Sequence, residues 1–217
     1  MGTSTSQPSP PGGGWGPVRR GYSDPDVQAP EIVSRIVQAM DDDFVAGLSS
    51  APVARALRRL MAHAGEVAGA GRDRERLAAV AQSIREEVED VTAVRRDSSQ
   101  FGDLALSAVT PAVLASSRLP PGTPLPRTFL ATYLAHVFSH IVGRDITRHV
   151  GQGQFTGVVE AGKFVHAAED HVARELQALE LAALEAAEDE DEISAVLTEI
   201  VPRALERLVL EEGEDAS

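Results

Sequence analysis

Apolar residues recur at three- and four-residue spacing along most of this chain, which is the period of an amphipathic helix. Pro30 can open the first such segment, and Ile32, Val33 and Ile36 follow it on one face. Further stripes of the same period run over residues 50–67, 73–94, 98–114, 128–142, 157–188 and 192–208. Alternating β patterns are not evident. The sequence therefore predicts an all-α protein, a single bundle of about six to seven helices spanning residues 29–210.

Two segments rich in turn-forming residues interrupt the helices. Residues 119–127 (LPPGTPLPR) form a Pro-rich connector, which we predict to be a stiff spacer between two helices. Residues 151–157 (GQGQFTG) hold three glycines, and we predict a flexible hinge between the helices at 128–142 and 157–188. Backbone amides of this loop could also approach an anion at the start of the following helix, and this alternative stays open.

The two ends of the chain differ in composition from the bundle. Residues 1–28 are rich in Ser, Pro and Gly, so we predict a disordered leader. Trp15, the only tryptophan, lies within this leader and is either a docking anchor for a partner or an incidental residue. Residues 211–217 (EEGEDAS) are predicted to form an acidic tail.

Composition narrows the chemistry that the chain can carry. It has no cysteine, which excludes disulfides, zinc–thiolate sites, iron–sulfur clusters and thiol nucleophiles. Only 4% of the residues are aromatic, and the apolar residues are mainly Ala, Val and Leu, which favours helices packed closely through small side chains. Lys163 is the only lysine among 20 basic residues, and this arginine bias in an alanine-rich chain is typical of a bacterial genome of high GC content.

The formal net charge of −13 is concentrated near the C-terminus. Residues 175–217 carry 14 acidic side chains against two arginines, while the rest of the chain is close to neutral. Because no basic stripe is present to neutralise phosphates, we expect no nucleic-acid partner. A protein partner or self-association is expected instead. With no membrane-length apolar run and no signal-like N-terminus, we expect no membrane contact and a cytoplasmic location.

Five of the six histidines fall between residues 136 and 171, which makes this region the first place to look for a metal site. His136 and His140 are four residues apart, so on a helix their rings lie on one side. On the helix at 157–188, His166 and Asp170 have the same spacing, with Glu169 as an alternative carboxylate. Two helices that each supply two ligands are how metal centres are built in helical bundles. The alternative is that these histidines are ordinary residues bonded to backbone carbonyls or hydroxyls.

No residue set completes a catalytic signature. The sequence G-x-x-x-x-G-K at 157–163 matches the start of a P-loop, but Phe164 stands where Ser or Thr must bind magnesium, and no strand precedes it. We interpret this match as chance. The sequence thus predicts a non-enzymatic helical protein-interaction or regulatory module without a cofactor. The alternative is a metal-dependent enzyme or sensor that holds one divalent metal, such as Zn, Fe or Mn, between the helices at 128–142 and 157–188.

Overall fold

The computed structural model describes residues 14–97, 99–116, 118, 124–151 and 153–210. These residues form an all-helical fold with no β-strand among them, so the predicted fold class is confirmed. The helices are α1 (Trp15–Gly21), α2 (Ala29–Ala39), α3 (Asp42–Leu48), α4 (Ala51–Ala62), α5 (Ala64–Ala70), α6 (Arg74–Arg95), α7 (Gln100–Ser116), α8 (Leu125–Ile146), α9 (Val158–Leu176), α10 (Ala182–Ala186) and α11 (Glu190–Glu206).

The bundle contains more helices than the six to seven predicted, because several expected helices are divided. The segment at 50–67 is broken at His63 into α4 and α5. The helix expected at 157–188 ends at Leu176, and the short α10 follows after a turn. Asp41 starts the separate helix α3 by accepting a hydrogen bond from the Phe44 amide at 2.8 Å, which satisfies a free N–H of the first turn.

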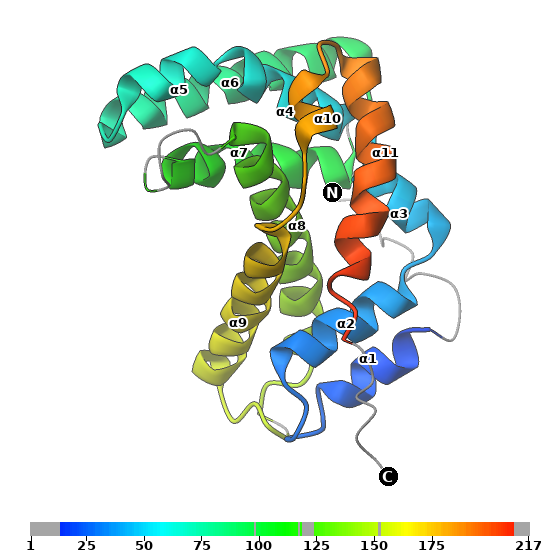
Figure 1. Cartoon of the computed structure of the whole chain (residues 1–217). Coiled ribbons are helices and arrows are strands. Elements are labelled where there is room, and N and C mark those ends of the chain that lie inside the picture. The colour runs from blue at the N-terminus through cyan, green and yellow to red at the C-terminus, as the bar shows by residue number, and fades with distance from the viewer. Residues whose placement is uncertain (1–13, 98, 117, 119–123, 152, 211–217) are drawn as a thin grey trace, which may run out of the picture.

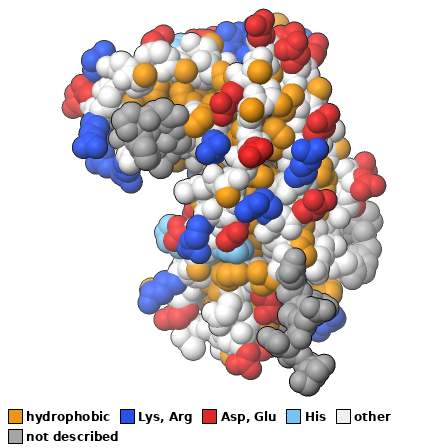
Figure 2. Space-filling model, viewed as in Figure 1, with side chains coloured by type: hydrophobic (Ala, Val, Ile, Leu, Met, Phe, Trp, Pro, Cys, Tyr) orange, Lys and Arg blue, Asp and Glu red, His pale blue; other side chains and the backbone are white. Residues whose placement is uncertain are grey.

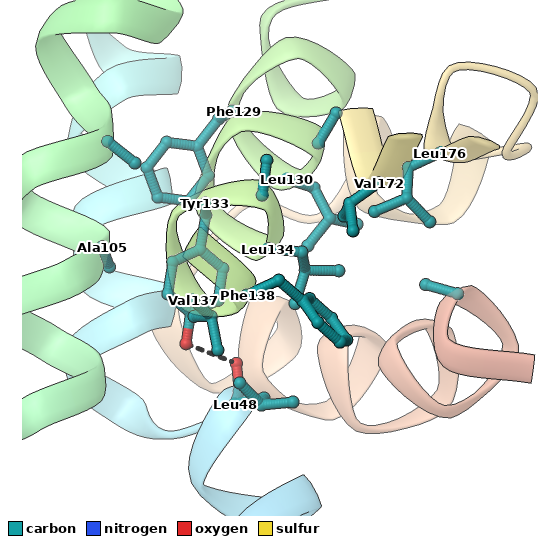
Figure 3. Packing of buried hydrophobic residues seen from close by; sticks show 14 of the residues in the cluster. Leu48, Ala105, Phe129, Leu130, Tyr133, Leu134, Val137, Phe138, Val172 and Leu176 are labelled. Atoms are coloured by element: carbon teal, nitrogen blue, oxygen red, sulfur yellow. Dashed lines mark hydrogen bonds between the residues drawn. The ribbon is translucent and has the colours of Figure 1, made fainter. Parts of the chain in front are cut away.

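Helix α8 lies at the centre of the fold, between α7 and α9 (Figure 1). Its Phe129, Leu134 and Phe138 side chains are almost fully buried. Phe129 also stacks on Tyr133, with ring centroids 6.1 Å apart, and the Tyr133 hydroxyl donates a hydrogen bond of 3.3 Å to the Leu48 carbonyl oxygen (Figure 3). Burial of each such side chain contributes roughly 1.5–3 kcal/mol to the free energy of folding. Helix α8, which contains the segment predicted at 128–142, is therefore packed in the interior of the fold.

The prediction that residues 1–28 form a disordered leader is wrong for residues 14–28. Trp15 and Val18 in α1, and Tyr22 just after it, are buried. Helix α1 packs against α2, and the Tyr22 ring lies against His149 and Phe164. The spacing of Trp15, Val18 and Tyr22 places them on one face of a helix. This apolar face was not predicted, because the Gly and Pro residues around it favoured disorder. Trp15 is 7% exposed and so is part of the core, not a free docking anchor. Residues 14–28 belong to the packed domain, and residues 1–13 lie outside the described residues.

The two interrupting segments take different forms. Residues 119–123 of the Pro-rich connector lie outside the described residues, and from Leu125 onward the remainder is the first turn of α8, where proline is well tolerated. The loop at 151–157 is held by a hydrogen bond of 2.6 Å from the Gly151 amide to the Phe155 carbonyl oxygen. Phe155 is 2% exposed, so this loop is anchored to the core. The acidic tail at 211–217 lies outside the described residues.

Acidic side chains gather at the upper end of the molecule, where α11 begins (Figure 2). Asp189 caps this helix by accepting hydrogen bonds from the Asp191 and Glu192 amides at 3.0 and 2.9 Å. Negative charge at a helix N-terminus is favourable because it opposes the helix dipole. None of the described helices has both the length and the apolar content needed to cross a membrane.

Candidate interaction groove

An open groove of about 450 Å³ lies where α6, α7 and the first turn of α4 meet. Its apolar floor includes Val88, Pro52 and Leu106, of which Val88 is 4% exposed. The exposed side chains Glu89, Arg96 and Asp103 form its charged rim. The groove is lined by Pro52, Val88, Glu89, Thr92, Ala93, Arg96, Ser99, Gly102, Asp103 and Leu106.

The local sequence explains why α6 and α7 come together here. Arg96 ends α6 in the left-handed conformation, with φ 57° and ψ 34°, and so turns the chain back along the helix that it has just left. The Ser99 hydroxyl then accepts a hydrogen bond of 3.0 Å from the Gly102 amide in the first turn of α7. A Cβ on Gly102 would lie 2.8 Å from the Pro52 Cβ, so only glycine allows α7 to approach α4 this closely.

A buried arginine supports one wall of the groove, although it does not line the groove itself. The side chain of Arg55 in α4 is 2% exposed. Its Nη1 donates to Thr92 Oγ1 and Asp97 Oδ1, both at 3.0 Å, and its Nη2 donates to Asp97 Oδ2 at 2.6 Å. Nη2 also donates to Glu190 Oε1 at 3.1 Å, and that carboxylate accepts from Arg95 at 2.8 Å. Since Thr92 lines the groove, this network ties the groove wall to the start of α11.

These charges stabilise one another. The hydrogen bond to Asp97 raises the pKa of Arg55 more than burial lowers it. The same bond to Arg55 lowers the pKa of Asp97 below its usual value. Both groups are therefore charged at neutral pH, and the buried guanidinium of Arg55 keeps a charged partner. Arg55 was not among the residues predicted to be functional, although its position in the otherwise apolar stretch P-V-A-R-A-L is the signal that could have indicated burial.

The residues predicted as metal ligands are not gathered into a site. His136 is half-buried, and its Nδ1 lies 2.9 Å from the Thr132 carbonyl oxygen of the preceding turn. His140 and Asp170 are exposed, and the exposed His166 has its Nδ1 3.5 Å from Glu169 Oε2. In the described part of the chain, no three His, Asp or Glu side chains stand close enough together to hold a metal ion. The His136 contact is the backbone alternative that the sequence left open.

The other histidines occupy separate places. His63 lies between two carboxylates, with Nδ1 3.1 Å from Glu66 Oε1 and Nε2 2.9 Å from Glu87 Oε1. His149 Nδ1 lies 3.3 Å from the Ser23 hydroxyl. His171 is 8% exposed, and burial lowers its pKa. Its buried Nε2 has no hydrogen-bond partner among the described residues.

The P-loop-like segment at 157–163 is the start of a helix. Gly157 is the N-cap of α9, and the residues from Val158 onward are helical. Phe164 packs edge-on against Phe155, with ring centroids 5.2 Å apart. A backbone that follows the α-helix uses its amides for internal hydrogen bonds after the first turn, so this segment does not form a phosphate-binding loop.

Comparison with known proteins assigns no family to the chain, which matches no protein-family model, no curated protein sequence and no solved structure. Evidence on function comes from the geometry of its own residues. Within the part of the chain that the structure describes, the groove between α6 and α7 has the shape of a binding site.

Proposed function

We propose that this protein is a non-enzymatic helical interaction module that binds a protein segment in the α6–α7 groove. The observation that carries the proposal is the groove itself, about 450 Å³ in volume, with Val88 and Leu106 in its floor and charges on its rim. An apolar centre surrounded by polar groups is the usual arrangement of a protein–protein contact. A volume of this size accepts a few side chains of a partner helix or loop.

The groove is supported so that it keeps its shape without a partner. Arg55 holds Thr92, in the groove wall, and Asp97, in the turn that joins the two helices. A site that is already formed loses less conformational entropy on binding than one that must be ordered. This preorganisation favours recognition of a partner by a fixed surface.

The charge of the chain favours a protein partner, or a second copy of the chain, over nucleic acid. The formal net charge of −13 would repel phosphate backbones. We propose that the protein works in the bacterial cytoplasm. The metal-dependent alternative has less support, because His136, His140 and His166 do not gather with other described residues into a group that could hold a metal ion.

Site-specific photo-crosslinking in producing cells tests the proposal. A photoreactive amino acid at Ala93 stands in the groove, and one at the exposed Ala178 is the control. We expect a discrete adduct from position 93 alone, and its loss when Leu106→Glu is added, because a carboxylate in the floor disfavours an apolar side chain. Circular dichroism checks that Leu106→Glu remains folded. Equal adducts from both positions, or none from position 93, would overturn the proposal.

A further inference from the structure

Two adjacent valines at the start of α9 are exposed to solvent. Val158 is 77% exposed and Val159 is 66% exposed. The other exposed large apolar side chains in the described part of the chain, Val94 and Leu210, are far apart in sequence. Leaving two neighbouring valines in water forfeits roughly 1.5–3 kcal/mol of burial for each. This pair is therefore available to a contact outside the molecule.

The face of α9 that carries the valines continues with a small residue and a cation. Gly162 and Lys163 follow Val159 by three and four positions, so the three share one side of the helix. A Cβ built on Gly162 would meet nothing within 4 Å, which shows that the surface there is open. Lys163 is exposed, and none of the ion pairs found among the described residues includes it. We call Val158, Val159, Gly162 and Lys163 the α9 knob.

The knob and the groove are complementary in chemistry. The groove has an apolar floor between two exposed carboxylates, Glu89 on α6 and Asp103 on α7. The knob has two valines followed, one turn later, by a cation. Opposite charges around an apolar centre set the orientation of a contact as well as its strength.

We infer that the α6–α7 groove of one copy receives the α9 knob of a second copy. The inference rests on the proposed function and names the partner of that site. The valines enter the floor beside Val88 and Leu106, and Lys163 lies between the carboxylates of Glu89 and Asp103. In Figure 1, α6 crosses the upper part of the molecule and α9 begins at its lower end. The contact therefore joins two different surfaces, which makes the association head-to-tail. A contact of this small size gives weak, concentration-dependent assembly.

Two variants with opposite defects test this contact. The groove variant carries Glu89→Lys and Asp103→Lys, and the knob variant carries Val158→Ser and Val159→Ser. All four positions lie on the surface, at groove rim or helix end, so the fold should tolerate the changes. A control variant, Glu180→Lys with Glu185→Lys, changes the net charge as much as the groove variant does, at two exposed positions outside both surfaces.

Sedimentation velocity over a roughly hundredfold range of concentration gives the readout. We expect the sedimentation coefficient of the wild type and the control variant to rise with concentration. Each defective variant alone should associate at least about tenfold more weakly. An equimolar mixture of the two should form a one-to-one complex that grows no further, because one intact groove then meets one intact knob.

The inference is overturned if the wild type sediments as a monomer throughout, or if the mixture associates no better than its components. These failures are distinct from failure of the proposed function. The wild type could be monomeric while residue 93 still crosslinks to another protein. That result would exclude a second copy as the partner, but the groove would still be a binding site. Self-association that the groove variant does not weaken would likewise remove this contact.

Discussion

Arg55 and Asp97 form a two-point ion pair, with Nη1–Oδ1 and Nη2–Oδ2 distances of 3.0 and 2.6 Å. The planar guanidinium matches the carboxylate, and two parallel charge-assisted hydrogen bonds fix the angle between α4 and the α6–α7 turn. The Arg55 side chain is 2% exposed and that of Asp97 is 35% exposed. Removing the carboxylate alone would leave a buried cation with fewer partners, which is worse than removing both groups.

We therefore expect Asp97→Ala to lower the free energy of unfolding by about 1.5–3 kcal/mol, the usual contribution of hydrogen bonds to a charged group. In an Arg55→Met background the same change should cost much less, since the cation is no longer there. Urea denaturation at neutral pH measures both. A cost that is equal in the two backgrounds would show that Asp97 acts independently of Arg55. Arg58→Ala, on the exposed side of α4, is the control and should change stability by less than about 0.5 kcal/mol.

His171 makes stability depend on pH in a predictable direction. Burial lowers the pKa of His171 below its ordinary value of 6.5. As pH falls, the unfolded chain binds this proton before the folded chain does, so folding is favoured above about pH 6.5 and the advantage is lost as pH falls through the folded-state pKa. We expect the urea midpoint of the wild type to fall between pH 7.5 and 5.

In His171→Leu this fall should be smaller, because leucine does not titrate and leaves no buried nitrogen unpaired. His166→Gln, at an exposed position of the same helix, is the matched control and should retain the wild-type slope. If His171→Leu and the wild type show the same pH dependence, the buried imidazole is not the source of it.

Tyr133 and Tyr22 differ in what their buried hydroxyls contact. Tyr133 donates to the Leu48 carbonyl at 3.3 Å, whereas the Tyr22 hydroxyl has no hydrogen-bond partner among the described residues. Tyr133→Phe should therefore cost about 0.5–1.5 kcal/mol, and Tyr22→Phe should be neutral or stabilising. Denaturant unfolding of the two variants side by side measures the difference. A larger loss for Tyr22→Phe would mean that its hydroxyl is satisfied in solution.

Trp15 provides the test of whether the N-terminal helix is part of the domain. Trp→Ala in a core costs about 3–5 kcal/mol, and a domain of this size loses about 2–4 °C in melting temperature for each kcal/mol. Trp15→Ala should therefore lower the melting temperature by more than about 6 °C, and deletion of residues 1–28 should lower it at least as much. Differential scanning calorimetry measures both melting temperatures. If the Trp15→Ala variant and the truncated protein both melted at the temperature of the wild type, α1 would not be packed on the domain.

The histidine region makes a separate prediction about metal. Because His136 contacts the Thr132 carbonyl and His140 is exposed, we expect neither a chelator nor added zinc to shift the melting temperature. A bound metal would stabilise the folded state by mass action. A metal-dependent rise that His140→Ala abolishes would contradict this expectation and would restore the metal-centred alternative. Elemental analysis of untagged protein gives an independent answer.

Sequence patterns could not predict contacts between side chains that are distant in sequence. The spacing of His136 and His140 correctly placed both on one helix, but it could not show whether other described residues would join them as metal ligands, and none does. Arg55 contacts Asp97 and Glu190, which lie 42 and 135 positions away. The residues next to Arg55 in the sequence therefore could not predict this hydrogen-bond network. The groove likewise needs Gly102 next to Pro52, a contact between two helices that periodicity does not specify.

The sequence by itself determined that this protein is helical and where most of its helices lie, because the apolar period and the capping residues are local properties. Asp73, for example, accepts hydrogen bonds from the Glu75 and Arg76 amides and begins α6 where the pattern predicted. Only the tertiary structure decided that Trp15 is core, that Arg55 is buried and that α6 and α7 leave a groove. Burial depends on which faces meet, and meeting faces are set by the packing of the whole chain, not by the spacing within one helix.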